Sequence, residues 1–243
     1  MPEEPEETSH GEQDARLRPF PSDPDEARSL QESLAHRVRV TAVDPDSVSL
    51  VAGTDVTYSP DDQRLVAAVV VLSRRTLEVV DHATTVAEPR FPYVPGLFAF
   101  REAPPLMETI GKLRTSPDVV LCDGAGRAHP RRFGLACHMG WSLGRPTIGC
   151  AKSLLVGAAE PLAEERGSWS DLVAEGDVVG RALRTRTGVR PVYISVGHDA
   201  DLAGSTRLVL DLSPRYRIPE PIRAADQLSR EILRGDGDRS GNV

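Results

Sequence analysis

An acid followed by glycines and bases stands in the middle of the chain and could take part in phosphate chemistry. Asp123 follows four apolar residues that predict a short buried strand, and it begins the turn Asp-Gly-Ala-Gly. Glycine lets the backbone of such a turn bend or approach a ligand closely. His129, Arg131 and Arg132 follow at once. An acid at a strand end, followed by a glycine turn and basic residues, fits a metal-assisted reaction on a phosphate ester. The alternative is an ordinary strand-turn-helix junction with solvated charges.

Two further acids could join Asp123. Asp55 lies in an otherwise apolar strand candidate, where a carboxylate is costly unless it meets a metal, a base or water; its alternative is a solvated strand face. Glu102 follows Phe-Arg, and its alternative role is a salt bridge or a cap for the next helix. Mg²⁺ typically takes one or two carboxylates plus waters and substrate phosphate. A metal site formed by these acids is therefore a hypothesis that depends on their convergence.

Two polar residues follow or end apolar strand candidates. Lys152 is one of only two lysines in the chain, the other being Lys112. It could reach a phosphate as a point charge, or be a surface lysine whose stem covers apolar residues. His198, in Gly-His-Asp, could be a ligand, a general base or a helix cap.

An aromatic and apolar segment precedes Glu102. Residues 87–104 are predicted to be a loop stiffened by prolines, with Phe91, Tyr93, Val94 and Leu97 near its tip. Such a tip could insert between bases or stack on a displaced base. The alternative is a loop packed onto the core.

Composition and charge favour one folded domain with polar tails. The chain has 243 residues, of which 40% are hydrophobic, enough for one well-buried core. Residues 1–28 hold nine acids and three arginines, which accounts for most of the net charge of −7. The near-neutral remainder can carry a local basic surface for phosphates. We expect a catalytic domain over residues 24–234, with disordered tails at 1–23 and 235–243.

The cysteines and the apolar runs suggest an intracellular protein. The three cysteines form no C-x-x-C pair, and Cys122 and Cys150 adjoin apolar runs, so we expect buried thiols in a reducing compartment. No apolar stretch approaches the roughly 18 residues that span a membrane. The N-terminus does not begin with a basic and then apolar signal. We therefore expect a cytoplasmic protein without membrane association.

The periodicity of apolar residues indicates the order of the elements. It predicts a helix over 24–39 and strands at about 47–58, 64–73 and 76–86, the last two forming a hairpin. Strands at 119–122, 146–151, 177–185 and 190–196 then combine with helices after 104 and over 132–142, 200–212 and 219–234. Residues 158–175 are expected to be a polar connection with a short helix. This order predicts an α/β domain with a mixed sheet.

A series of short motifs resembles one known family. The motifs are Gly-Thr-Asp-Val (53–56), Pro-Tyr-Val-Pro-Gly-Leu-Phe-Ala-Phe-Arg-Glu (92–102), Asp-Gly-Ala-Gly-Arg-Ala-His-Pro-Arg-Arg-Phe-Gly-Leu-Ala (123–136), Pro-Thr-Ile-Gly-Cys-Ala-Lys-Ser (146–153), Gly-His (197–198) and Pro-Glu-Pro-Ile-Arg-Ala-Ala-Asp (219–226). Their order is similar to that of the endonuclease V family, and the resemblance covers about residues 27–234. The Pro-Tyr-Val-Pro-Gly and His-Pro-Arg-Arg-Phe-Gly blocks are its most specific parts.

The resemblance implies a ribonuclease-H-like α/β fold, with a mixed sheet flanked by helices. It implies a DNA repair endonuclease that cuts one nucleotide 3′ of deoxyinosine, the product of adenine deamination, and leaves 3′-hydroxyl and 5′-phosphate ends. The implied partner is inosine-containing DNA, with inosine in RNA as the alternative, bound by a monomer.

The same resemblance assigns roles to residues. Asp55 and Asp123 would bind Mg²⁺, with Mn²⁺ as a substitute, while Glu102 completes the acidic site and His198 assists it. Lys152 would contact the scissile phosphate. Tyr93 would be a wedge that fills the gap left by the flipped base. The substrate-binding residues beside it would be Pro92, Val94, Gly96, Leu97, Gly124, Gly126 and His129.

Some residues depart from the family pattern. Ala125 stands where the family usually has His, Val196 where it has Pro, and Asp199 where it has a base. Asp199 would add a negative charge near a phosphate track. These departures motivate a rival hypothesis, an inosine-binding protein with weak or lost cleavage. Another ribonuclease-H-like nuclease, acting for example on branched DNA, is a second rival.

Overall fold

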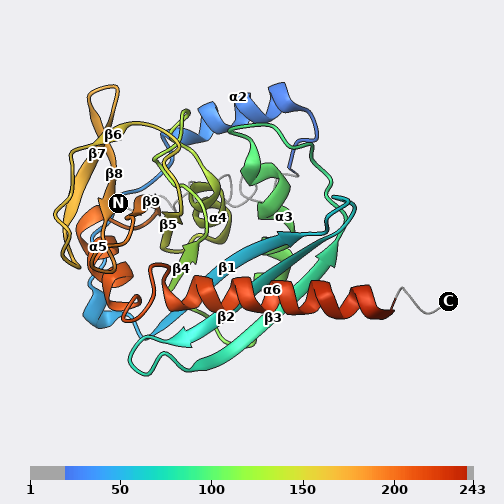
Figure 1. Ribbon diagram of the computed structural model, residues 1–243. Coiled ribbons are helices and arrows are strands. Elements are labelled where there is room, and N and C mark those ends of the chain that lie inside the picture. Colours follow the sequence, from blue (N-terminus) through green and yellow to red (C-terminus); the bar gives the residue numbers. More distant parts are fainter. Residues whose placement is uncertain (1–19, 240–243) are drawn as a thin grey trace, which may run out of the picture.

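The computed structural model describes residues 20–239, so most of the expected acidic tail, residues 1–19, lies outside the described residues, as do residues 240–243. The described chain forms a nine-stranded mixed sheet in the order β3-β2-β1-β4-β5-β9-β8-β7-β6. Helices cover both faces of this sheet (Figure 1). The predicted α/β class is therefore confirmed.

Three parallel strands form the centre of the sheet. Strand β1 (Leu50–Tyr58) pairs in parallel with β4 (Val119–Cys122), which pairs in parallel with β5 (Thr147–Ala151). On its other side β1 pairs antiparallel with β2 (Leu65–Ser73), and β2 forms the predicted hairpin with β3 (Val79–Ala87). Because parallel strands end at the same edge of a sheet, this arrangement brings their carboxyl ends together.

The other half of the sheet is antiparallel. Strand β9 (Val192–His198) pairs with β5 and is followed outward by β8 (Asp177–Leu183), β7 (Trp169–Ala174) and β6 (Ala158–Ala159). The short helix expected within 158–175 is wrong, since that segment holds two of these strands. The turn between β7 and β8 consists of Glu175 and Gly176, with φ values of 55° and 87°. Two such residues favour a tight hairpin, which draws the polar segment into the sheet.

Two pairs of helices cover the sheet. Helices α3 (Phe98–Gly111) and α4 (Leu135–Leu143) pack on one face, where they bury Ala52 of β1. Helices α5 (Leu202–Asp211) and α6 (Glu220–Arg239) pack on the other face, where Val51 is buried. Successive strand side chains point to opposite faces. Asp55 lies four residues after Val51 in β1, so its side chain points to the same face of the sheet, toward α6.

Three helix boundaries differ from the predictions by four residues or more. The N-terminal helix α2 (Pro24–Ala35), capped by the Asp23 side chain, ends four residues early. Helix α3 starts at Phe98 and contains Pro104 and Pro105, so Glu102 lies on a helix rather than in the predicted loop. Helix α6 continues to Arg239, five residues into the segment expected to be a disordered tail.

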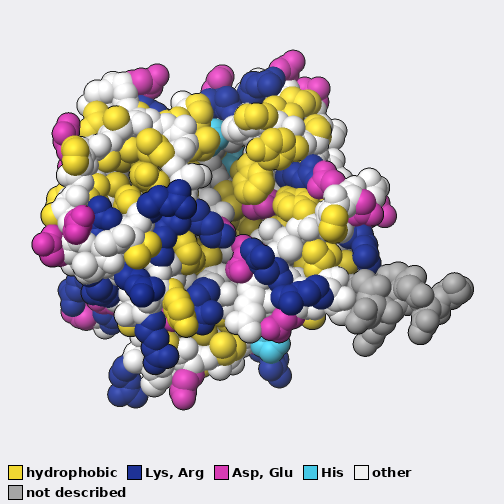
Figure 2. Space-filling view, in the orientation of Figure 1, with side chains coloured by type: hydrophobic (Ala, Val, Ile, Leu, Met, Phe, Trp, Pro, Cys, Tyr) yellow, Lys and Arg dark blue, Asp and Glu magenta, His cyan; other side chains and the backbone are white. Residues whose placement is uncertain are grey.

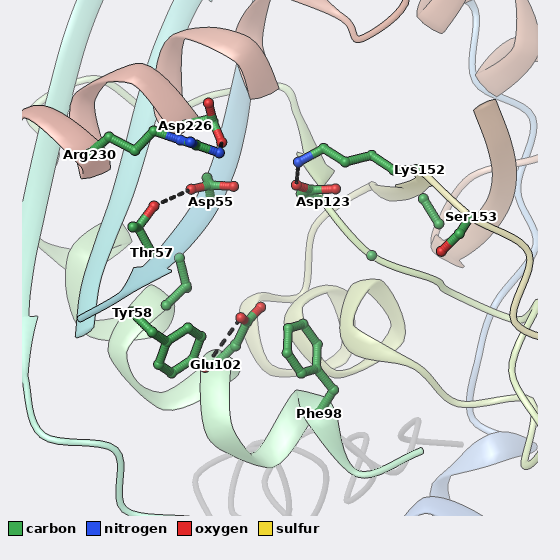
Figure 3. A pocket seen from close by; sticks show the side chains of 13 residues that line it. Asp55, Thr57, Tyr58, Phe98, Glu102, Asp123, Lys152, Ser153, Asp226 and Arg230 are labelled. Atoms are coloured by element: carbon green, nitrogen blue, oxygen red, sulfur yellow. Dashed lines mark hydrogen bonds and ion pairs between the residues drawn. The ribbon is translucent and has the colours of Figure 1, made fainter. Parts of the chain in front are cut away.

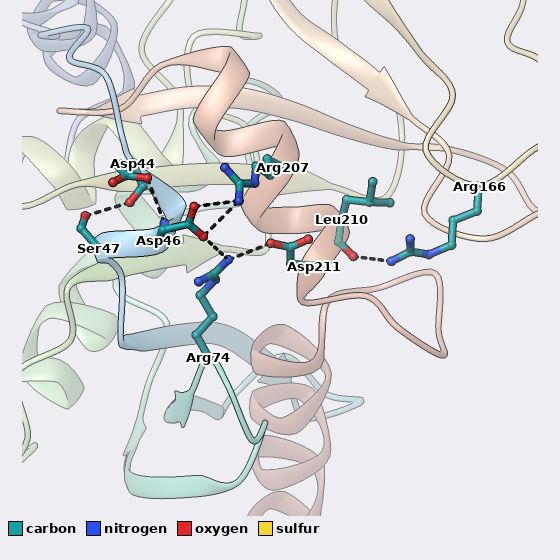
Figure 4. A network of polar contacts seen from close by, with 8 residues as sticks. All are labelled: Asp44, Asp46, Ser47, Arg74, Arg166, Arg207, Leu210 and Asp211. Atoms are coloured by element: carbon teal, nitrogen blue, oxygen red, sulfur yellow. Dashed lines mark hydrogen bonds and ion pairs between the residues drawn. The ribbon is translucent and has the colours of Figure 1, made fainter.

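A cluster of ion pairs joins the β2–β3 hairpin to α5. Arg74, in the hairpin turn, lies 2.9 Å from a carboxylate oxygen of Asp211 and 3.5 Å from one of Asp46 (Figure 4). Asp46 belongs to the short helix η1 (Pro45–Ser47) and also accepts from Arg207 at 2.9 Å. The network fixes the end of the hairpin that lies far from the carboxyl ends of the central strands.

The described helices and the cysteines bear on two of the sequence-based expectations. In residues 20–239 no helix combines the length and apolar character needed to cross a membrane. Cys122, Cys137 and Cys150 are all buried free thiols, as predicted for the first and third of them.

Candidate active site

The predicted acids line one cavity at the carboxyl edge of the central strands. Asp55, Glu102, Asp123 and Lys152 border this acidic pocket, which has a volume of about 470 Å³ (Figure 3). On the surface, acidic side chains appear near the middle of the same face with Lys and Arg side chains beside them (Figure 2). The three acids of the metal-site hypothesis therefore border one pocket in the fold.

Different elements supply these side chains. Residue 54 of β1 pairs with residue 122 of β4 as the last pair of this parallel ladder, so Asp55 and Asp123 occupy neighbouring positions directly after it. Lys152 follows directly after β5. Glu102 projects from α3 on the other side of the pocket. No short stretch of sequence contains the site, because the sheet assembles it.

Helix α6 adds residues to the pocket that the sequence did not assign. Asp226 and Arg230 line the pocket, and Ser229 donates a hydrogen bond of 2.8 Å to Oδ2 of Asp55. These positions are three and four residues apart, so they lie on one face of the helix. Asp226 ends a motif that carried the family resemblance, and this was the only signal for it in the sequence.

A glycine of β1 determines how closely α6 approaches the sheet. A Cβ atom on Gly53 would lie 2.0 Å from the backbone carbon of Pro221, in the first turn of α6. Only glycine permits this contact without displacing the helix. The contact lies two residues before Asp55 and five before Asp226, so it fixes the distance between those two walls of the pocket.

Two of the four acids are paired with cations. The Lys152 ammonium lies 2.5 Å from Oδ2 of Asp123, and the Arg230 guanidinium lies 2.9 Å from Oδ1 of Asp226. Asp55 accepts from the hydroxyls of Ser229 and Thr57, and Glu102 accepts from Tyr58 at 3.3 Å. Among the described residues, then, the two most buried acids have neutral donors only.

This arrangement leaves negative charge that is poorly compensated. Burial raises the pKa of Asp55 to about 6, helped by repulsion from Asp123 and Asp226 and opposed by the Ser229 hydrogen bond. Burial and the charges of Asp55 and Asp123 raise the pKa of Glu102 well above its usual value. Although burial opposes the charge of Lys152, the neighbouring Asp123 raises the pKa of this ammonium. The pocket therefore favours an added positive charge.

The donor set fits a hard divalent cation. In residues 20–239, no group of three or more His, Cys, Asp or Glu side chains is placed so that it could hold a metal ion. Mg²⁺ does not need one, because it usually keeps waters and takes one or two carboxylates together with substrate phosphate. The carboxylates of Asp55 and Asp123, on neighbouring parallel strands, match that mode of binding.

A second, more apolar cavity adjoins the first. It has a volume of about 320 Å³, and Phe98, Gly124, Ala151 and Ser153 line both cavities. Several predicted substrate-binding residues border this second cavity, namely Tyr93, Val94, Gly96, Gly124 and His129, together with Ala125 and Leu155. Tyr93 is 71% exposed at its edge. The predicted wedge is thus a surface side chain beside a pocket, not part of the core.

His129 holds the wall of the second cavity. Its Nδ1 accepts from the backbone N–H of Arg131 at 3.2 Å, so its Nε2 carries the proton and donates to the carbonyl oxygen of Gly96 at 2.9 Å. Burial, with the charge of Arg131, lowers the pKa of His129 to about 4. A neutral imidazole with both nitrogens occupied fixes the loop that carries Tyr93.

Three predicted substrate-binding residues do not line either of these cavities. Leu97 is fully buried with Phe91 and Phe100 in a core cluster. Gly126 packs against β9, where a Cβ atom would lie 2.1 Å from the carbonyl oxygen of Val196. Pro92 is exposed outside both linings.

His198 lies apart from the acids, contrary to its expected role. Its ring is fully buried, packs edge-on against Trp141 and accepts from the backbone N–H of Arg39 at 3.3 Å. Strand β9 is antiparallel to β5, and His198 pairs with Thr147, the first residue of β5. That pairing places His198 at the opposite edge of the sheet from Lys152.

Asp199 also lies away from the pocket. It pairs with the Arg39 guanidinium at 2.5 Å and lines neither of the two cavities. The expectation that Asp199 adds negative charge to a phosphate track is therefore wrong. Burial of Asp199 opposes its charge, but the Arg39 hydrogen bond dominates and lowers its pKa.

Comparisons of the sequence and of the structure with known proteins lead to the same family. The family model for endonuclease V matches residues 32–227. An endonuclease V of Roseiflexus castenholzii is 47% identical over 216 residues, which cover 88% of this chain and 95% of the relative. The crystal structure of endonuclease V from Streptomyces avermitilis has a TM-score of 0.86 and 46% identity, covering 90% of this chain and 96% of that one.

A second solved structure contains nucleic acid. Endonuclease V of Ciona intestinalis, in complex with a 23mer DNA containing an inosine followed by a ribo-adenosine, has a TM-score of 0.78 and 29% identity, covering 87% of this chain and 97% of that one. These likenesses extend over nearly the whole described chain and confirm the predicted ribonuclease-H-like fold. The chain belongs to the endonuclease V family.

Proposed function

We propose that this protein is a deoxyinosine-directed endonuclease that hydrolyses the phosphodiester bond one nucleotide 3′ of the lesion. The products would carry 3′-hydroxyl and 5′-phosphate ends. The observation that supports this most is the adjacency of the acidic pocket and the apolar cavity beside Tyr93. The inosine-containing DNA bound by the Ciona intestinalis relative supports the choice of lesion.

In this proposal Asp55 and Asp123 hold Mg²⁺, for which Mn²⁺ can substitute. A bound divalent cation supplies Lewis acidity toward the phosphate and lowers the pKa of water. Glu102, buried and poorly compensated, completes the acidic wall, and Asp226 is a further candidate ligand because it faces the same pocket. His198 is not part of this proposal, since β9 carries it to the far edge of the sheet.

The two cations of the pocket would bind phosphate. Lys152 and Arg230 lie on different sides of the acids, each within reach of one carboxylate (Figure 3). When a carboxylate turns to a metal ion, its cationic partner is left to meet another anion. Lys152 would then stabilise charge that develops on the scissile phosphate, and Arg230 would bind a neighbouring phosphate.

The apolar cavity would receive the displaced base. Flipping a base costs a few kcal/mol and is cheapest when pairing is already weak, which favours a deaminated purine over normal bases. Tyr93, exposed at the edge of the cavity, would fill the gap in the stack. We propose a monomer acting on one strand, with DNA as the main substrate and inosine in RNA as the alternative.

A nicking assay with matched variants tests the proposal. Purified protein with Mg²⁺ should cut an inosine-containing DNA strand one nucleotide 3′ of the lesion, and Asp55→Ala and Asp123→Ala should not. Asp177→Ala, which removes an exposed acid outside both cavities, should cut normally. Tight binding without turnover under Mg²⁺ or Mn²⁺ would favour the binding-protein rival. Parallel strands containing inosine in RNA, mismatches, flaps and junctions separate the remaining alternatives.

A further inference from the structure

Two hydroxyls connect helix α6 and strand β1 directly behind Asp55. Ser229 Oγ lies 2.8 Å from Oδ2 of Asp55, and Thr57 Oγ1 lies 2.7 Å from Ser229 Oγ. Thr57 Oγ1 is also 3.2 Å from the same carboxylate oxygen. Ser229 is completely buried, and Asp55 is 6% exposed. The three side chains form one closed polar cluster between the helix and the sheet.

The number of protons decides the direction of these bonds. Each hydroxyl has one proton to donate, and the carboxylate has none. The two shortest contacts are satisfied together when Thr57 donates to Ser229 and Ser229 donates to Asp55. Ser229 Oγ also lies 3.0 Å from the carbonyl oxygen of Asp226, one turn earlier in α6, but its one proton is already donated to Asp55 in this arrangement. The bond from Ser229 to Asp55 itself ties the carboxylate to the helix that carries Asp226 into the pocket.

We propose that Ser229, supported by Thr57, is a positioning residue that orients the Asp55 carboxylate for its divalent cation. Among the described residues, both hydroxyls lie against Oδ2 of Asp55, to which Ser229 donates; this fixes the rotation of the carboxylate and leaves Oδ1 for other partners. Groups that hydrogen-bond to a metal-binding carboxylate commonly set its orientation and affinity. This inference rests on the proposed function, in which Asp55 holds the cation.

The location of the cluster argues for this role over simple packing. Asp55 has no cationic partner among the described residues, so its only direct polar restraints are these hydroxyls. Ser229 belongs to the same helical face as Asp226 and Arg230, both of which line the acidic pocket. A movement of α6 would therefore change the carboxylate orientation and the charges around it together.

Binding of Mn²⁺ to the protein alone tests the inference without any cleavage. Free Mn²⁺ is measured by electron paramagnetic resonance during titration of the wild type, Ser229→Ala, Ser229→Thr and Thr57→Val. Ser229→Ala should weaken Mn²⁺ binding by about 10-fold, and Ser229→Thr, which keeps a hydroxyl, should retain affinity close to that of the wild type. Thr57→Val should cause a smaller loss, because Thr57 donates to Ser229 and acts on the carboxylate only through it.

A matched control removes the same atom elsewhere. Ser205 on α5 is also completely buried, and its hydroxyl has no hydrogen-bond partner among the described residues. Ser205→Ala should leave Mn²⁺ affinity unchanged. Equal affinity of Ser229→Ala and the wild type would overturn the inference, and so would an equal loss in Ser229→Ala and Ser229→Thr.

Asp55→Ala separates this inference from the proposed function. If Asp55→Ala abolishes Mn²⁺ binding while Ser229→Ala does not weaken it, the cation assignment stands and only the positioning role of Ser229 fails. If Asp55→Ala binds Mn²⁺ as well as the wild type does, the assignment of Asp55 as a ligand fails, and the inference fails with it.

Discussion

Lys152 and Asp123 form an ion pair across the ends of two parallel strands, with 2.5 Å between the ammonium nitrogen and a carboxylate oxygen. In the proposed reaction each member has another partner, the cation for Asp123 and the scissile phosphate for Lys152. The pair therefore keeps both side chains at the reaction centre and must separate when substrate and metal bind. Loss of one member of the ion pair should therefore affect catalysis and metal binding differently.

Lys152→Ala should lower the rate of cleavage without weakening metal binding. We expect kcat to fall by about 10²–10³-fold, because a charge that stabilises the developing phosphate charge is lost. Mn²⁺ affinity should stay the same or rise, since Asp123 no longer has a competing cation. Single-turnover nicking and calorimetric titration with Mn²⁺ measure the two effects. Lys112→Ala, at the other lysine of the chain, is the control; a loss of Mn²⁺ affinity in Lys152→Ala would contradict this account.

Removing the charge of Asp55 should stabilise the protein while abolishing its activity. The pKa of Asp55 is raised from 3.8 to about 6 by burial, so its contribution to stability is present at low pH and is lost as pH rises through about 6. In a chelating buffer at neutral pH, Asp55→Asn should increase the free energy of unfolding by up to about 3 kcal/mol. Denaturant unfolding at several pH values measures this gain.

The gain from Asp55→Asn should shrink as the pH falls toward 4, where the wild-type carboxylate is itself protonated. A gain that grows toward low pH would show that the charge of Asp55 is not the cause. The same titration predicts that metal affinity of the wild type decreases below about pH 6, because protons then compete for Asp55.

Tyr58→Phe should move the acidic limb of the pH–activity profile to higher pH. Burial is the main reason that the pKa of Glu102 is raised, and the Tyr58 hydroxyl, 3.3 Å from Oε1, opposes this rise. Without that hydroxyl the carboxylate loses a donor, so protonation begins at higher pH. Tyr216→Phe, at an exposed tyrosine outside both cavities, should leave the profile unchanged. An unshifted profile in Tyr58→Phe would exclude this link between Tyr58 and Glu102.

Gly53→Ala should disrupt the pocket through helix α6. The added Cβ atom would meet the backbone of Pro221 at 2.0 Å, and backbone cannot rotate away as a side chain can. We expect a loss of roughly 1–3 kcal/mol in unfolding free energy, together with loss of nicking. Gly111→Ala, at the end of α3 with open space around it, should be neutral or stabilising by up to about 1 kcal/mol. Normal activity in Gly53→Ala would show that the α6 contact is not needed.

Tyr93→Ala should affect cleavage without affecting folding. The side chain is 71% exposed, so unfolding free energy should change by less than about 0.5 kcal/mol. Nicking of duplex DNA with inosine should fall more than nicking of a single strand, where no gap in a stack has to be filled. Trp169→Ala removes another exposed aromatic residue outside both cavities and should not change this ratio. Equal losses on both substrates in Tyr93→Ala would argue against the wedge.

The local pattern of the sequence determined most of the elements. Continuous apolar runs predicted β2 and β4, and the short link between β2 and β3 predicted their hairpin. Local pattern failed where distant pairing decides the outcome. Residues 169–174 are polar enough to resemble a connection, yet they form β7 because a tight turn brings them against β8. The prolines of α3 suggested a loop, yet the helix begins six residues before Pro104.

By itself, the sequence determined the types of the reactive side chains, the strand that carries Asp55 and the strand ends followed by Asp123 and Lys152, because an acid within an apolar run, or an acid or a lysine directly after one, is a local feature. Only the tertiary structure decided which side chains share the pocket. Close contact at Gly53 brings Asp226, Ser229 and Arg230 of α6 beside Asp55, whereas the antiparallel direction of β9 carries His198 to the other edge. The physical reason is that strand direction and helix packing are set by contacts between residues far apart in the chain, which local sequence does not encode.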